Sequence, residues 1–496
     1  MMRKHLSLPQ SISARLPHGR KRYLSLVVMM TIFFIVGLFL FYSRGMFVAL
    51  LPFTVSTTDF GTPTFTCPLD AYGGINDGTT LNTTAFVRAI EDCSSHGGGT
   101  VIVPEGHWLT GPIHLKSNIR LEISEKAEVF FSQNFSDYLP VVFSRYEGME
   151  LYNYSPLIYA ADCQNVAIGG KGTLNGQGAA WWEWKAFQSF GTERLYQMIK
   201  ENVPVSERIF GTTKDALRPS FIQFINCSGI TLEDFTIMNG PMWTIHPIYS
   251  SDILIRNLTV RTEGANNDGI VIDSSRDVLI ENSTLDTEDD AIVIKSGLDA
   301  DGWRVGKPSE NIVIRNCVVG RGNGGIVIGS EMSGDVRNVT VSNCEFNGAK
   351  RGIRIKSARG RGGIVENIQI DNVRMTDIEQ EAIFLDMTYY SKNSVIPSSD
   401  TAPTFRNISF KNIICSRANT AIKIIGLPEN PITQTSFSDI DIKARNGIEA
   451  TNITASEFNN IHIVTEDKPT VTFKDTHDIL FEGKKMNAAT FSPKQK

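Results

Sequence analysis

Two adjacent aspartates stand at the start of an apolar stretch in the segment TLDTEDDAIVIKSG, residues 284–297. The aliphatic alternation after Asp289 and Asp290 predicts a buried strand. Two unit charges about 4 Å apart repel each other by about 4 kcal/mol at an effective dielectric constant near 20, so this pair costs stability. Close carboxyl groups also raise the pKa of one member, which leaves a proton donor beside an ionised partner. The pair is therefore a candidate for acid and base chemistry.

The surroundings of these acids depend on a repeat that fills the chain after residue 220. A phrase of alternating apolar residues, such as DILIRNL, NIVIRNC or NIQIDNV, returns at intervals of 21 to 40 residues, and a second group of phrases (DGIVIDS, DAIVIKS, GGIVIGS, RGIRIKS) lies between. Each unit is too short to bury an apolar face unless neighbouring units stack on it. The pattern predicts an all-β parallel solenoid with loops of variable length. The alternative, an antiparallel sandwich or propeller, would show regular blade lengths.

Stacking turns sequence register into geometry, because equivalent residues of successive coils lie about 4.8 Å apart. The second group of phrases aligns on its closing serines, Ser274, Ser296, Ser330 and Ser357, which follow Asp268, Asp290, Gly324 and Arg351 by six residues. Asp268 therefore lies beside Asp290 on the next coil. The preceding column contains Asn267, Asp289, Asn323 and Lys350. Three carboxylates thus converge on one patch.

Cations surround this patch. The isoleucines of the strands alternate into the core, so Lys295, Arg354 and Lys356 face outward beside the acids. A purely structural interpretation exists, because Asp and Asn often satisfy backbone amides in solenoid turns. It explains one column of acids, but not an adjacent pair with a third acid in register. The arrangement favours glycoside hydrolysis, in which two carboxyl groups act as acid and base.

The sequence that precedes the repeat predicts a capping helix and an insertion. TTAFVRAIEDC, residues 83–93, has the apolar spacing of an amphipathic helix that closes the open end of the core. Of the seven cysteines we expect one disulfide at most, between Cys67 and Cys93. The segment 179–217 reads as a long insertion. Its Trp181 and Trp182 could line a sugar cleft, although packing within the insertion is the preferred interpretation.

The N-terminus predicts a membrane anchor. Residues 24–42 are 19 residues without a charge, and as a helix they span about 28 Å, close to the hydrocarbon core of a bilayer. Residues 1–23 are basic and contain no acid, which favours a cytosolic tail, a type II signal anchor, and a stem over 43–66. The alternative is a cleaved signal peptide. We expect a single-pass protein of the secretory pathway, at the Golgi or cell surface, or a protein secreted to the cell wall if the anchor is cleaved.

The net charge and the glycosylation sequons limit the partners and modifications that we expect. Residues 1–44 contain seven of the 48 Lys and Arg, so the remainder has 41 bases against 53 acids, a net charge of −12. Nucleic acid is therefore not an expected partner. Nine N-x-S/T sequons begin at Asn82, Asn134, Asn153, Asn226, Asn257, Asn282, Asn338, Asn407 and Asn452. Many lie inside the repeat, so we predict that most are turn asparagines and that only a few are glycosylated.

Four segments carry a family resemblance. NNDGI, EDDAIVIKSG, RGNGGIVIGSEMSG and RGIRIKS resemble, in order, the N-T-D, D-D, G-H-G and R-I-K signatures of the polygalacturonases of glycoside hydrolase family 28. The resemblance covers about residues 67–480 and leaves 481–496 as a tail. It implies a right-handed, single-stranded parallel β-helix of the pectin-lyase-like kind. It also implies a monomer that hydrolyses α-1,4-galacturonosyl links of pectin with inversion, in cell-wall metabolism, without a metal or other cofactor.

The resemblance also assigns roles to residues. Asp289 would be the general acid, and Asp268 with Asp290 would orient and deprotonate the attacking water; an inverting site needs about 6.5 to 9.5 Å between acid and base. Arg354 and Lys356 would grip substrate carboxylates. The remaining predicted substrate contacts are Asn266, Lys295, Asn323 and Tyr389, with packing alone as the alternative for Tyr389 and Tyr390 as an alternative match.

Two positions depart from the family pattern. Asn267 replaces the Thr of N-T-D, and Asn323 replaces the histidine of G-H-G. Asn323 falls beside Asp289, where it can hydrogen-bond but cannot titrate near neutral pH. The replacement predicts reduced activity, a shifted pH optimum or another pectic linkage. His246 is the nearest histidine in the sequence, and we interpret it as structural.

Two other functions compete with hydrolysis. A calcium-dependent pectate lyase would also use a parallel β-helix with clustered acids. A non-catalytic or weakly active β-helix that binds pectin would follow if loss of the histidine abolished turnover. The sequence does not decide between endo and exo attack, although IGSEMSG resembles exo-acting members of the family.

Overall fold

The computed structural model of the chain describes residue 55 and residues 60–61, 65–389, 401–467, 470–486 and 490–491. The predicted cytosolic tail (1–23) and anchor (24–42), most of the predicted stem (43–66) and Tyr390 lie outside the described residues. Among the residues that are described, no helix is both long enough and apolar enough to cross a membrane.

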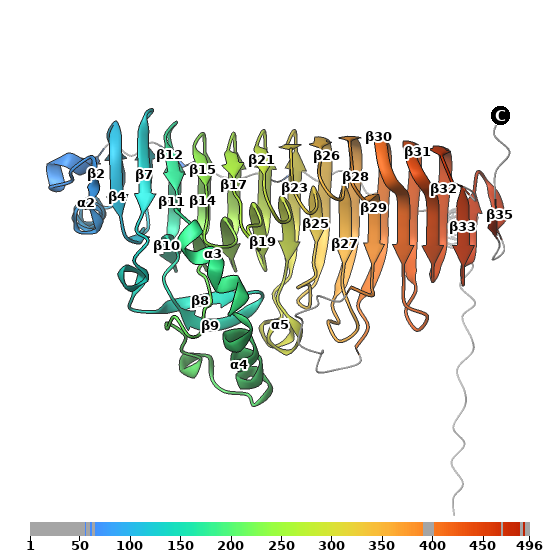
Figure 1. Cartoon of the computed structure of the whole chain (residues 1–496), viewed down its shortest axis with the longest axis horizontal. Coiled ribbons are helices and arrows are strands. Elements are labelled where there is room, and N and C mark those ends of the chain that lie inside the picture. Colours follow the sequence, from blue (N-terminus) through green and yellow to red (C-terminus); the bar gives the residue numbers. More distant parts are fainter. Residues whose placement is uncertain are drawn as a thin grey trace, which may run out of the picture. The chain divides into compact units, whose positions relative to one another are not determined.

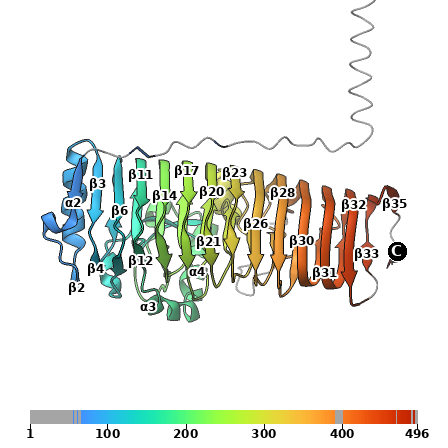
Figure 2. The same cartoon turned by 90° about the horizontal axis from the view of Figure 1, so that it is seen from above.

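The chain coils into a parallel β-helix, with successive coils stacked in one row (Figure 1). The view from above shows the same row of strands turned by 90° (Figure 2). The predicted all-β, right-handed parallel β-helix is confirmed. Phe481 ends β34 (His477–Phe481), and β35 (Lys484–Met486) pairs antiparallel with it, so the sheet extends past residue 480 into the predicted tail.

Three strand columns form the walls of the β-helix. The first contains β1 (Thr66–Pro68), β3 (Gly99–Val103), β6 (Ile119–Ile123), β11 (Gln164–Gly169), β14 (Ser228–Glu233), β17 (Ser251–Arg256), β20 (Arg276–Glu281) and β23 (Ser309–Arg315). The second contains β2 (Asp77–Leu81), β4 (Gly106–Thr110), β7 (Ala127–Phe131), β12 (Thr173–Asn175), β15 (Thr236–Met238), β18 (Thr259–Arg261), β21 (Thr284–Asp286) and β24 (Val318–Val319). The third column carries the predicted site.

The third column contains β5 (Ile113–His114), β10 (Ile158–Ala161), β13 (Ile222–Ile225), β16 (Ile245–Ile248), β19 (Ile270–Asp273), β22 (Ile292–Lys295), β25 (Ile326–Ile328), β27 (Ile353–Lys356) and β29 (Glu381–Asp386). Ile270, Ile292 and Ile326 are Cα partners on successive coils, and all three are buried in the core. The predicted register of the second group of phrases is therefore confirmed.

Later coils continue in longer strands that turn from one wall to the next. These are β26 (Val336–Asn347), β28 (Ile364–Thr376), β30 (Thr404–Ile425), β31 (Ile432–Thr451) and β32 (Ile453–Thr465), followed by β33 (Val471–Lys474) and β36 (Thr490–Phe491). Phe410, Phe437 and Phe458 stack ring on ring in their interior, with centroids 4.9 and 4.7 Å apart. The same interior position on each coil is thus filled by the same side chain.

Asparagines with left-handed backbone mark the corners of the coils. Six sequon asparagines adopt φ values between 53° and 56°: Asn226, Asn257, Asn282, Asn338, Asn407 and Asn452. Asn tolerates this conformation better than other residues with a side chain, because its short amide bonds locally. Asn338 donates to Asn311 Oδ1 at 3.1 Å and accepts from Asn367 at 3.0 Å, so these amides form a ladder along the corner. The interpretation of these six as turn asparagines is confirmed.

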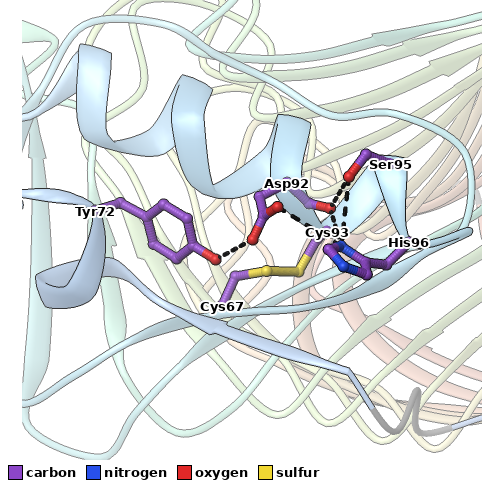
Figure 3. The surroundings of a disulfide bond; sticks show 6 residues. All are labelled: Cys67, Tyr72, Asp92, Cys93, Ser95 and His96. Carbon is purple, nitrogen blue, oxygen red and sulfur yellow. Dashed lines mark hydrogen bonds and ion pairs between the residues drawn. A yellow bond between two sulfur atoms is a disulfide. The ribbon is translucent and has the colours of Figure 1, made fainter.

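The N-terminal cap is a helix fixed by a disulfide. Helix α2 (Thr83–Ser95) buries Phe86, Ile90 and Cys93 against the first coil. Cys93 is bonded to Cys67 of β1, and Asp92 accepts a hydrogen bond from the Tyr72 hydroxyl at 2.6 Å, as Figure 3 shows. Both the capping helix and the disulfide were predicted from the sequence. The other five cysteines are free and buried.

Segments outside the β-helix gather on one flank (Figure 1). They comprise the antiparallel hairpin of β8 (Val142–Tyr146) and β9 (Met149–Asn153), the helices η2 (Phe135–Tyr138), α3 (Ala179–Trp182), η3 (Glu183–Ala186), α4 (Ser189–Lys200) and η4 (Val205–Glu207), and α5 (Asp299–Val305). Trp181 is fully buried among aromatic rings, and the Trp182 indole packs against Gly264. The packing interpretation is confirmed for Trp181, whereas Trp182 is partly exposed and contacts the coils rather than the insertion.

The flank covers the outward face of the third column. Val271, Val293 and Val327, which alternate with core isoleucines on β19, β22 and β25, belong to a buried cluster with Tyr146, Met149 and Leu195 of the flank. These outward valines therefore face protein rather than solvent.

Candidate active site

The three predicted catalytic carboxylates lie in one pocket. Backbone bonds confirm their register, since Gly269 N donates to Asp290 O at 3.0 Å and Thr244 N donates to Asp268 O at 2.9 Å. Asp268 and Asp290 are buried, and Asp289 is partly exposed. All three line a pocket of about 640 Å³. The stacking of coils thus brings together acids that are 21 residues apart in the sequence.

The pocket has two kinds of wall. The coils supply the acids together with Trp243, Asn266, Lys295, Asn323, Glu331, Lys356 and Tyr389, whereas the flank supplies Glu147, Met149, Lys185, Gln188, Ser189 and Tyr196. Eight of the nine predicted catalytic and substrate-binding residues line this pocket. Arg354 does not line the pocket. Its guanidinium packs over the rings of Phe384 and Tyr389, at 5.5 and 4.9 Å from the centroids.

Asp290 forms the central ion pair. Lys356 Nζ donates to Asp290 Oδ2 at 2.8 Å, and both side chains are almost fully buried. Burial opposes ionisation of Asp290, but the charges of Lys356 and Lys295 outweigh burial and lower the pKa of Asp290. Asp290 is therefore an ionised carboxylate at neutral pH, suited to accept a proton.

The other two acids shift in the opposite direction. Burial, followed by the charge of Asp290, raises the pKa of Asp289. Burial, followed by the charge of Asp289, raises the pKa of Asp268 well above its usual value. One ionised carboxylate beside two carboxyl groups that hold protons more tightly is the division of labour that general acid and base catalysis needs.

Lys295 and Glu331 form a second pair. Lys295 Nζ lies 2.6 Å from Glu331 Oε2 and 3.9 Å from Asp268 Oδ2, and its ammonium sits over the Trp243 ring at 4.8 Å. Burial opposes ionisation of Glu331, yet Lys295 outweighs it and lowers the pKa of Glu331 to about 2. Sequence reasoning assigned Lys295 to the substrate but missed Glu331. The sequence does contain a sign of this residue, because Glu331 directly follows Ser330, the closing serine of GGIVIGS.

Asn323 contacts the predicted general acid. Its Nδ2 lies 3.4 Å from Asp289 Oδ1, and its Oδ1 accepts from Arg351 Nη1 at 3.2 Å. Arg351 also donates to Glu381 Oε2 at 2.9 Å. Because a guanidinium can only donate, the Asn323 amide must present its NH₂ group to Asp289. The predicted contact between Asn323 and Asp289 is confirmed, and the orienting Arg351 was not foreseen.

Asn266 joins the flank to the coils. Its Oδ1 accepts from Lys185 Nζ at 2.6 Å and from Arg218 Nη2 at 3.0 Å. Lys185 comes from η3 of the insertion, which has no repeat register, so the sequence could not place it. His246 lies outside the pocket lining and is fully buried, bonded to Ser220, Gln223 and Asp273. Its structural interpretation agrees with this position.

Within the described residues no group of three or more His, Cys, Asp or Glu side chains is arranged to hold a metal ion. The ammonium groups of Lys295 and Lys356 pair with Asp268 and Asp290.

A parallel β-helix with paired carboxyl groups in a flank pocket defines a class of polysaccharide-degrading enzyme. The sequence profile described as Glycosyl hydrolases family 28 matches residues 93–465, and the chain belongs to this family. It is 30% identical to a "Probable polygalacturonase" of Vitis vinifera, covering 75% of this chain and 73% of that protein. It is 28% identical to the "Exo-poly-alpha-D-galacturonosidase" of Dickeya chrysanthemi, covering 82% and 72%.

Solved structures agree with this assignment. The hyperthermoactive exopolygalacturonase from Thermotoga maritima is 37% identical with a TM-score of 0.74, covering 87% of this chain and 94% of that one. The family 28 exopolygalacturonase of Yersinia enterocolitica shares the fold, with a TM-score of 0.72 at 21% identity over 84% of this chain and 78% of that one. The family predicted from four short signatures is confirmed.

Proposed function

We propose that the protein hydrolyses α-1,4-galacturonosyl links of a pectic polysaccharide with inversion at the anomeric carbon. The observation that carries the proposal is the contrast within one pocket between Asp290, ionised by Lys356, and Asp289, whose pKa is raised. Asp289 protonates the leaving oxygen, Asp290 takes the proton of the attacking water, and Asp268 helps to orient that water. The names of the relatives support galacturonan as the substrate.

Neighbouring side chains position the sugar in this proposal. Lys356 and Lys295 attract uronate carboxylates, while Tyr389, Asn266 and Asn323 contact the ring and its hydroxyl groups. Arg354 contributes through its contact with the Tyr389 ring. Lys356 is already paired with Asp290, so its ammonium serves both substrate binding and ionisation of the base.

We infer exo attack from the flank. A polymer bound along an open β-helix face would run across successive coils, but here the hairpin β8–β9 and helix α4 cover the outward valines of β19 and β22. The substrate then enters the pocket by one end. The exo-acting relatives support this mode.

The test is incubation of the purified full chain with polygalacturonate, with the product anomer followed by NMR and product sizes by chromatography. We expect short products from the first turnover, in the anomeric form opposite to that of the link cleaved. Retention of configuration would contradict the roles given to the three acids. An unsaturated product lost on adding a chelator would indicate the calcium-dependent lyase, and tight binding without turnover would indicate the pectin-binding alternative.

We further propose that residues 24–42 anchor a monomer in membranes of the secretory pathway and that a few sequons carry glycans. The support is the uncharged 19-residue segment behind a basic tail. Protease treatment of sealed microsomes is expected to spare the β-helix domain and remove only the N-terminal tail. Digestion of the β-helix domain from outside would reject this orientation.

A further inference from the structure

Glu147 occupies an unusual backbone position at the pocket. It forms the two-residue turn between β8 and β9 with Gly148, and their φ values are +44° and +82°. Positive φ at both central residues is the type I′ geometry, in which Asn-Gly and Asp-Gly are strongly preferred. A glutamate is therefore a poor choice for the turn itself. Strained positions of this kind cluster at sites where ligands are held.

The tip of the hairpin is fixed in place. Leu298 N donates to Gly148 O at 3.1 Å, and a Cβ added to Gly148 would come within 2.7 Å of Leu298 N. At the end of β8, Arg145 Nη1 donates to Asp273 Oδ1 of β19 at 2.8 Å. The carboxylate of Glu147 is thus presented to the pocket by a turn that is held on both sides.

Glu147 has no partner within the part of the chain that the structure describes. No hydrogen bond or ion pair joins its side chain to another described residue, although it lines the pocket with Lys185, Glu331 and the three acids. Burial raises the pKa of Glu147, and the charge of Lys185 opposes this effect. An acceptor left without a donor in a pocket is expected to receive one from the ligand.

The chemistry of a galacturonan narrows the choice of donor. Each sugar of the polymer carries hydroxyl groups, which donate, and a carboxylate, which a second carboxylate repels. Glu331 is paired with Lys295, whereas the ionised carboxylate of Glu147 has no such partner among the described residues and would repel a further uronate beyond the sugar at the acids. Only a terminal sugar has a free hydroxyl where the chain would otherwise continue.

We propose that Glu147 recognises the non-reducing end of the substrate by accepting hydrogen bonds from hydroxyl groups of the terminal sugar, and that its charge rejects a longer chain. The orientation follows from the order of the coils, because Lys356 and Tyr389 lie on later coils than Leu298, which holds the tip of the hairpin, and there the Lys356 ammonium attracts the departing part of the polymer. This role rests on the proposed hydrolysis of galacturonan. It identifies Glu147 as the residue that restricts hydrolysis to the end of the polymer.

The test compares two oligogalacturonates of equal length. One has an ordinary non-reducing end, and the other has the 4,5-unsaturated end left by a lyase, which lacks the terminal 4-hydroxyl. For the wild type we expect kcat/KM to be about 10- to 100-fold lower on the unsaturated oligomer, the range of a hydrogen bond to a charged group. In Glu147→Gln the difference in kcat/KM between the ordinary and the unsaturated oligomer is expected to fall below about threefold, because kcat/KM on the ordinary oligomer decreases.

Two further variants separate binding from folding. Glu147→Asn suits the type I′ turn, so it is expected to raise Tm while it reduces the discrimination as Glu147→Gln does. Glu183→Gln changes an exposed carboxylate of η3 that does not line the pocket, and its discrimination should equal that of the wild type. Unchanged discrimination in both Glu147 variants of an active enzyme would overturn the proposal. Absence of any hydrolysis by the wild type would instead reject the proposed function.

Discussion

Replacement of Asp289 by asparagine is expected to lower kcat by about 10³-fold, because general acid catalysis contributes about 10²- to 10⁴-fold and an amide cannot deliver the proton. Substrate affinity should change little, since Lys356, Lys295 and Tyr389 remain in the pocket. The measurement is kcat on trigalacturonate together with the Kd for the same ligand. Asp286→Asn is the matched control, because Asp286 lies on β21 outside the pocket lining and pairs with Arg321.

The same variant has a pH signature. The folded-state pKa of Asp289 is raised, so the folded protein binds a proton more tightly than the unfolded chain, and stability is lost as pH rises from the ordinary aspartate pKa of 3.8 through the raised pKa. Asp289→Asn removes this loss. Its Tm relative to wild type should therefore increase between pH 4 and pH 7, while the Asp286→Asn difference stays flat. A kcat within tenfold of wild type would reject Asp289 as the general acid.

The repeat made the acid cluster predictable. Once the strands stack in parallel, the register of DGIVIDS and DAIVIKS places Asp268 beside Asp290 without any knowledge of the loops. The same register brought Asn323 to Asp289 and Lys356 to Asp290, both of which form the contacts described above. In a repeating element, the repeat period determines which residues lie beside each other on successive coils.

The flank was not predictable in this way. Glu147 and Lys185 come from a hairpin and an insertion that lack the repeat, so no column of the alignment contains them. One signal was present, however. The fourth residue of each strand phrase on β19, β22 and β25 is an outward valine, and three apolar side chains on an outer face require a cover. On β27 the equivalent residue is Arg354, which packs over aromatic rings instead.

The hairpin depends on one buried ion pair. Arg145 Nη1 and Asp273 Oδ1 are 2.8 Å apart with no exposure of either side chain, and Arg145 also donates to Ser274 Oγ at 2.8 Å. His246 Nε2 lies 3.3 Å from the other oxygen of Asp273. Burial opposes ionisation of Asp273, but Arg145 and His246 outweigh it and lower the pKa of Asp273. Removal of Arg145 would leave Asp273 with only the hydrogen bond of His246, whose own pKa is lowered by burial, and removal of the Asp273 charge would leave Arg145 without its acid in the interior.

Arg145→Met is therefore expected to lower the free energy of unfolding by about 3 to 5 kcal/mol, the cost of leaving one buried charge without its partner. Asp273→Asn should cost a similar amount, whereas the double variant should recover part of the loss, because neither charge then remains buried. The check is denaturant unfolding of all three variants, with Arg445→Met as the control; the Arg445–Asp467 pair is more than half exposed and should contribute less than about 1 kcal/mol. Arg145 also holds the turn that carries Glu147. Arg145→Met should therefore reduce the preference for ordinary over unsaturated ends even at denaturant concentrations at which the protein is still folded. Additive losses in the double variant would show that the two charges do not act as a pair.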